Sequence, residues 1–93
     1  MVMHQQTALS ILRRKQVDAE SGYSRSTIYL RISQGLWVRP IALGARAVGW
    51  PANEVATLNA ARIAGSTDIE IRALVVKLEA ARINALSTRA TAP

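Results

Sequence analysis

The fold is decided by residues 21–35, which read Ser-Gly-Tyr-Ser-Arg-Ser-Thr-Ile-Tyr-Leu-Arg-Ile-Ser-Gln-Gly. Gly22 permits the left-handed turn that ends a helix at little cost. Ser24 is a good N-cap, because its hydroxyl accepts a hydrogen bond from an otherwise unpaired backbone N–H. Tyr23 supplies an apolar residue between the two. Glycine, an apolar residue and a capping hydroxyl are what the turn of a helix-turn-helix needs, so the stretch predicts two short helices joined at a sharp turn.

The two helices extend outward from this turn. The first covers residues 14–21, and the second runs from residue 24 to Gly35, where a second glycine ends it. Ile28 and Ile32 are four residues apart, so they share the inner face of the second helix. The first turn and outer face of that helix carry polar side chains suited to base edges and phosphates: Arg25, Ser26, Thr27, Tyr29 and Arg31.

The residues after Gly35 favour extended chain. Residues 36–43 and 47–50 predict two strands, and Gly44-Ala45-Arg46 predicts the turn between them. Trp37 and Trp50 are the large side chains that would anchor this hairpin to the helices, because an isolated hairpin is marginally stable. A helix-turn-helix followed by a basic hairpin is the winged-helix arrangement, with Arg46 at the tip of the wing.

The second half of the chain predicts two more helices. Pro51 suits the first turn of a helix that closes at Gly65. Thr67 and Glu70 form a capping box for a longer helix, which we expect to end near Leu86. The expected fold class is mainly α, a winged helix-turn-helix with a two-stranded β-hairpin wing and a long C-terminal helix. We expect a flexible tail over residues 1–10, the DNA-binding domain over 11–65, the C-terminal helix over 66–87 and a flexible tail over 88–93.

Composition excludes several classes of function. The chain has 93 residues, enough for one domain, with no cysteine and one histidine, His4. Disulfide scaffolds, thiolate zinc sites and thiol catalysis are therefore excluded, and no metal or cofactor is expected. No acid/base pair or activated nucleophile can be assembled, so we do not expect an enzyme. The sequence shows neither a membrane span nor a secretion signal, and a cytoplasmic location is expected.

The charge is strongly positive and unevenly placed. Twelve Lys and Arg against six Asp and Glu give a net charge of +6, and ten of the twelve cations are Arg. Residues 1–50 carry seven cations and two anions, a net of +5, whereas residues 51–93 carry five and four, a net of +1. Arg is suited to forked contacts with phosphate and guanine. The pattern indicates a polyanionic partner that touches the N-terminal half, and the alternative is a solvated basic surface without a partner.

Several of these residues resemble AlpA-type prophage regulators, small winged-helix proteins related to phage excisionases and to MerR-type DNA-binding domains. The resemblance covers roughly residues 12–62 and rests on Tyr23-Ser24-Arg25-Ser26-Thr27-Ile28-Tyr29, Gly35, Arg39-Pro40, Leu43-Gly44-Ala45-Arg46-Ala47-Val48-Gly49-Trp50 and Glu54-Val55. It implies a regulator of transcription or a directionality factor for excision that binds DNA near an integrase gene or attachment site. The helix after Thr67 extends past the family core, so the resemblance implies nothing about its role.

Ten residues are predicted to contact DNA. Arg25 is the first candidate for guanine, because a forked arginine–guanine pair discriminates between bases by about 1–3 kcal/mol. Arg46 is expected in a minor groove or on phosphate. Cations beside Arg13 at the start of the first helix oppose its dipole, which a nearby phosphate would relieve. The full set is Arg14, Lys15, Ser24, Arg25, Ser26, Thr27, Tyr29, Arg31, Arg39 and Arg46.

The C-terminal helix has apolar residues on two faces. One face carries Ile71, Leu74, Leu78, Ala81 and Ala85, and the other carries Ile69, Ala73, Val76, Ala80 and Ile83. Both faces cannot pack on one edge of a small domain, so one is expected to cover the core and the other to meet a second copy or another protein. The dimerisation face is predicted at Ile69, Ala73, Val76, Ala80 and Ile83. The alternative is an Ala-rich helix that tolerates exposure.

The residues together predict a sequence-specific double-stranded DNA-binding protein without catalytic activity. We expect a homodimer or a cooperative assembly on DNA, with two copies on half-sites about one helical turn apart, and integrase as a further partner. One alternative is an adaptor that docks on integrase or polymerase through the C-terminal helix, with DNA binding secondary. Another is an antitoxin-like or RNA-binding regulator.

Overall fold

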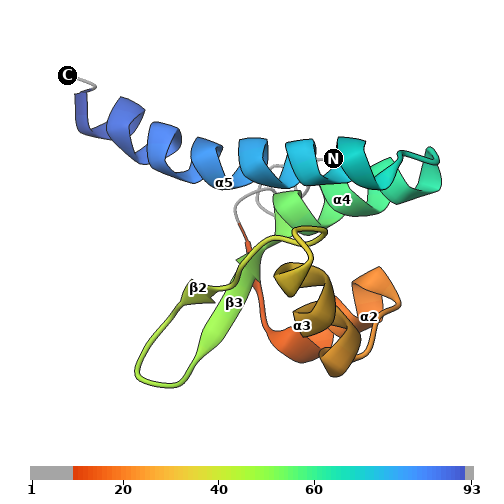
Figure 1. Cartoon of the computed structure of the whole chain (residues 1–93). Helices are drawn as coiled ribbons and strands as arrows, with labels where there is room; N and C mark the ends of the chain where they lie inside the picture. Colours follow the sequence, from red (N-terminus) through yellow and green to blue (C-terminus); the bar gives the residue numbers. More distant parts are fainter. Residues whose placement is uncertain (1–9, 92–93) are drawn as a thin grey trace, which may run out of the picture.

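A computed structural model describes residues 10–91, with side chains through residue 84. Four helices and a small antiparallel sheet make up this part of the chain, which confirms the expected mainly α fold with a hairpin wing (Figure 1). The elements in order are β1 (Ile11–Leu12), α2 (Arg14–Ser21), α3 (Arg25–Ser33), β2 (Ile41–Ala42), β3 (Val48–Pro51), α4 (Ala52–Ile63) and α5 (Asp68–Thr91). The expected tails lie outside the described residues, apart from Ser10 and the end of α5, and so does His4.

The helix-turn-helix forms as its turn residues predict. Gly22 follows α2 with φ 78°, and its N–H donates to Asp18 O at 2.9 Å. Only glycine adopts this left-handed conformation without strain. Ser24 caps α3, because its Oγ accepts from the Thr27 N–H at 3.3 Å. The angle between α2 and α3 is therefore set by local chemistry at residues 22–24.

The sheet differs from the predicted hairpin in two ways. Its order is β1-β3-β2, with β3 in the centre, so the wing has a third strand that the sequence did not predict. The incoming strand is also shorter than expected, since β2 covers only Ile41–Ala42, and residues 36–38 are buried in the core without belonging to the sheet. Pro51 is the N-cap of α4 and the last residue of β3, not a residue of the helix itself.

Gly49 explains how β1 fits against β3. A methyl group at this position would lie 2.5 Å from Cγ2 of Ile11 and 3.1 Å from Leu12 O. The lack of a side chain therefore lets β1 approach the central strand, in the register Ile11↔Pro51 and Leu12↔Trp50.

The core lies between the helix-turn-helix, the base of the wing and α4. Trp37 and Trp50 are fully buried, as predicted, and Trp50 Nε1 donates to Val38 O at 3.0 Å. The other fully buried side chains are Val17, Ile28, Val38, Val55 and Leu58, and Ile32 packs partly buried against them. The two tryptophans thus anchor the wing to the helices.

α5 is built into the same core. Figure 1 shows α5 running across the top of the view alongside α4, with the helix-turn-helix and the wing below these two helices. Ile71 and Val75 are buried, and Leu74 and Leu78 pack partly buried against the core. The capping box opens the helix as predicted, with Thr67 N–H donating to Glu70 Oε1 at 2.8 Å and Glu70 N–H donating to Thr67 Oγ1 at 3.2 Å.

The far end of α5 differs from the prediction. The helix continues to Thr91, past the expected end near Leu86, because no glycine or proline interrupts the residues in between. Within the described residues, no helix is both long and apolar enough to cross a membrane.

An ion pair fixes α5 against α4. Glu54 on α4 has a side chain only 5% exposed, and both its oxygens accept from Arg82 of α5, at 2.9 Å (Nε to Oε2) and 2.6 Å (Nη2 to Oε1). The same Nη2 donates to Arg39 O at 2.8 Å. One guanidinium therefore ties together α4, α5 and the segment that leads into the wing.

Candidate nucleic-acid interface

The first turn of α3 presents arginine and hydroxyl groups to solvent. Ser24, Arg25 and Ser26 are exposed, and Thr27 is half-buried. Ser24 Oγ also donates to Thr27 Oγ1 at 3.0 Å and lies 3.3 Å from Ser26 Oγ. Two of these hydroxyls are thus already engaged in capping the helix, which leaves Arg25 as the long side chain that reaches outward from the turn.

Tyr29 lies one turn after Arg25 and is exposed, although a half-buried ring was expected. The residue is 38% exposed, and its ring packs edge-on against Trp50, with 6.3 Å between the ring centroids. The Arg25 guanidinium lies over the exposed ring face, 5.9 Å from its centroid. This distance allows a cation–π contact, which restricts the directions that Arg25 takes.

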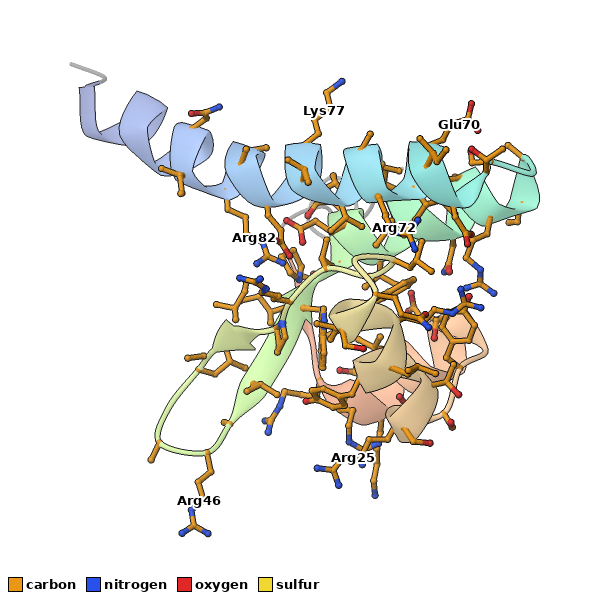
Figure 2. All side chains as sticks on the ribbon, viewed as in Figure 1. Arg25, Arg46, Glu70, Arg72, Lys77 and Arg82 are labelled. Carbon is orange, nitrogen blue, oxygen red and sulfur yellow. The ribbon has the colours of Figure 1, made fainter. Side chains whose placement is uncertain are left out.

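The wing places a second arginine on the same side of the molecule. The turn closes with Leu43 N–H donating to Ala47 O at 2.8 Å, so Arg46 stands at the exposed tip. Figure 2 shows Arg25 and Arg46 at the same end of the molecule, both pointing away from α5. The recognition-helix candidate and the wing tip therefore face the same direction.

A basic hollow lies between these elements. Its volume is about 550 Å³, and it is lined by Arg13, Arg14, Lys15, Arg25, Tyr29, Arg46 and Val48. Five of the seven lining residues are cations, and none of them is a carboxylate. Like charges gathered around one concave surface raise its positive potential and attract an anion. The start of α2, the start of α3 and the wing thus form a single basic surface.

Two of the basic residues at the start of α2 also have partners within the chain. Arg13 Nε donates to Val48 O at 3.1 Å, so it fixes α2 to the wing. Arg14 Nη1 pairs with Asp18 Oδ2 at 2.7 Å, one turn along α2. This pair offsets the unfavourable position of Arg14 near the helix N-terminus, which weakens one of the reasons for expecting a phosphate there.

Five predicted contact residues do not line the basic hollow. Ser24, Ser26 and Thr27 belong to the first turn of α3 beside Arg25, whereas Arg31 and Arg39 lie elsewhere. Arg31 lies over the Tyr23 ring, 5.3 Å from its centroid. Arg39 has its backbone N–H donating to Glu79 Oε2 at 2.8 Å, and it stands beside α5. The position of Arg31 follows from the geometry of α3, and that of Arg39 follows from the buried segment before β2. The positive charge of the two residues did not indicate these positions. DNA contact by all ten predicted residues stays a prediction.

A set of contacts that sequence reasoning missed holds α4 against the end of α2. Arg62 Nη1 donates to Ser21 O at 2.9 Å and Asn59 Nδ2 donates to Glu20 O at 2.9 Å, while the Arg62 guanidinium lies 4.2 Å from the Tyr23 ring centroid. These bonds satisfy carbonyls at the end of α2 that have no partner within the helix. The partners are about 40 residues apart in sequence, so no local pattern predicts them.

Comparison with known protein families identifies a match to the part of the chain that carries this surface. A family model described as "Prophage CP4-57 regulatory protein (AlpA)" matches residues 10–62, which is more than half of the chain. No curated protein and no solved structure matches the chain. The matched residues span β1 to α4 and include every side chain that lines the basic hollow.

Proposed function

Because the chain belongs to the AlpA family of prophage regulatory proteins, we propose that it binds double-stranded DNA sequence-specifically, as a transcription regulator or excisionase of a mobile element. The observation that carries this proposal is the basic hollow, which joins the first turn of α3 to the wing tip with five cations. α3 enters the major groove in this proposal, since that groove of B-DNA is about 12 Å wide and admits an α-helix.

The residues of the hollow divide into reading and positioning groups. Arg25 reads a guanine edge, because it is the long exposed side chain of the first turn of α3. Arg13, Lys15 and Arg46 bind the phosphate backbone or an adjacent minor groove, which fixes orientation without reading sequence. The hydroxyl of Tyr29, whose side chain is exposed, donates a hydrogen bond to a phosphate of the DNA backbone in this proposal.

The test is the affinity of the full chain for duplexes from its own genomic neighbourhood, located by footprinting and measured against salt concentration. The three cations assigned to the phosphate backbone, Arg13, Lys15 and Arg46, give a slope of log affinity on log salt of about −2.7. Arg25→Ala should remove about 1–3 kcal/mol of preference for the correct base, whereas Lys15→Ala should weaken all duplexes alike. Unchanged specificity in Arg25→Ala, or a slope near zero, would refute the proposed interface.

A second candidate function rests on the exposed face of α5. Ile69, Val76 and Ile83 are large aliphatic side chains open to solvent on one face. An adaptor that docks on integrase or polymerase would use such a face. Loss of recombination or transcription in Val76→Glu, with DNA affinity and the oligomeric state of the chain unchanged, would favour this candidate over self-pairing.

A further inference from the structure

The outer face of α5 is apolar and faces away from the rest of the molecule. Ile69, Val76 and Ile83 are 79%, 69% and 69% exposed, and they recur every seven residues along the helix. Ala73 and Ala80 stand between them and are exposed too. Alternating spacings of four and three residues are typical of a seam between two paired helices. The core-facing residues Ile71 and Val75 lie on the opposite side of the helix.

We propose that this face pairs with the same face of a second copy in antiparallel orientation, and that the resulting dimer bridges two segments of DNA duplex. The bridging part rests on the proposed DNA-binding function, whereas the pairing does not. We choose a second copy as the partner of this face because, in one orientation, the charged residues that flank the seam meet residues of opposite charge on the other copy.

Four charged residues flank the seam. Glu70 and Lys77 lie along one side, and Arg72 and Glu79 lie along the other. In an antiparallel pair centred between Ala73 and Val76, Ala73 packs against the partner's Val76 and Ile69 packs against the partner's Ala80. Glu70 then faces the partner's Lys77, and Arg72 faces the partner's Glu79. Since each contact occurs twice by symmetry, four opposite-charge pairs flank one apolar seam.

The other arrangements bring like charges together. A parallel pair places Arg72 against the partner's Lys77. An antiparallel pair shifted by one heptad toward the C-terminus places Lys77 against the partner's Lys77 and Glu79 against the partner's Glu79. The shift in the other direction opposes Glu70 with Glu70 and Arg72 with Arg72. Charge complementarity therefore selects one orientation and one register.

The flanking groups keep free capacity for such contacts. Lys77 has no hydrogen-bond or ion-pair partner among the described side chains, and Figure 2 shows it pointing away from the body of the molecule, as Glu70 does. Among the described residues, Arg72 uses only Nε, on Gln34 O at 2.9 Å, and Glu79 uses only Oε2, on the Arg39 N–H. Glu70 uses Oε1 for the Thr67 N–H, which leaves its Oε2. The terminal nitrogens of Arg72 and Oε1 of Glu79 remain for a partner.

The position of this seam decides what the dimer does. The basic hollow, marked by Arg25 and Arg46, lies at the end of the molecule opposite α5 (Figure 2). Two copies joined through the outer faces of α5 therefore direct their basic hollows in opposite directions. One straight duplex cannot contact both hollows, so each binds its own segment. This arrangement differs from the expected pair of neighbouring half-sites on one duplex.

The first experiment measures self-association of the full chain by sedimentation equilibrium. Lys77→Glu should raise the dimer dissociation constant about tenfold, because two favourable pairs become two repulsive ones. Adding Glu70→Lys to that variant should restore association, since the pairs re-form with their signs exchanged. A parallel pair would instead be strengthened by Lys77→Glu. A monomer at every concentration, or stronger association of Lys77→Glu, would overturn the pairing.

The second experiment measures bridging with an immobilised duplex and a second, fluorescent duplex that carry the same binding site. The wild-type chain should retain the second duplex, and Val76→Glu should lose retention while it still binds a single duplex. Ile63→Glu is the matched control, because Ile63 is 86% exposed at the end of α4 and lines a hollow with Glu20 and Ser21 of α2. Retention by Val76→Glu, or none by a dimeric wild type that binds one duplex, overturns bridging. A dimer that binds no duplex overturns the proposed function and bridging together, whereas the pairing stands.

Discussion

The ion pair between Glu54 and Arg82 gives the sharpest test of how the long helix is attached. The Glu54 side chain is 5% exposed and that of Arg82 is 24% exposed, with the shortest N–O distance 2.6 Å. Arg82→Met leaves a buried carboxylate without a partner, and breaking a buried pair in this way costs about 3–5 kcal/mol. Glu54→Gln should cost less, roughly 1–2 kcal/mol, because Arg82 keeps more contact with water and its bond to Arg39 O.

A double variant, with both Glu54 and Arg82 replaced, distinguishes a buried ion pair from an ion pair exposed at the surface. Once Glu54 is neutral, loss of the arginine no longer leaves a buried charge. We therefore expect the combined Glu54→Gln and Arg82→Met variant to be more stable than Arg82→Met alone. Urea denaturation measures this directly, with the fluorescence of the two buried tryptophans as the probe. Additive effects, or a cost below about 1 kcal/mol for Arg82→Met, would refute the reasoning, since both are typical of an exposed pair.

Three further predictions concern the wing, the long helix and the interface. Gly49→Ala should destabilise the chain by about 1–3 kcal/mol in thermal unfolding, because the added methyl meets β1. A chain truncated after Gly65 should lose its cooperative unfolding transition by circular dichroism, because α5 supplies two buried core residues. Tyr29→Phe should weaken binding to all duplexes alike by about 0.5–1.5 kcal/mol, measured by titration, without a change in melting temperature, since the ring keeps its packing.

The parts of the fold that could be predicted are those with local chemical causes. Gly22 ends α2 and Ser24 caps α3 through bonds that span at most four residues. The capping box at Thr67 is equally local. Such signals are present in the sequence itself, because the groups that bond are neighbours in the chain.

The parts that could not be predicted depend on distant partners. β1 has two residues, too few for any periodic pattern, and it exists because Gly49 leaves room for it. Glu54 stands in the first turn of α4, where an acid suits the helix dipole, yet it is buried and paired with Arg82, 28 residues away. Arg39 was assigned to the wing, but its backbone is bound from both sides by α5. In each case the structure depends on a contact with a residue far away in the sequence, which a local sequence pattern does not predict.

The contacts of α5 connect the two ideas proposed for this chain. Arg72 satisfies the carbonyl of Gln34 at the end of α3, while Glu79 and Arg82 hold the backbone of Arg39 just before the wing. The relative position of α3 and the wing therefore depends on a helix that lies outside the matched residues 10–62. Because Arg72 and Glu79 also flank the proposed seam, a partner helix would hold the same side chains that position α3 and the wing. Pairing should thus reduce the freedom of the basic hollow and raise its affinity for DNA, since part of the ordering cost is already met.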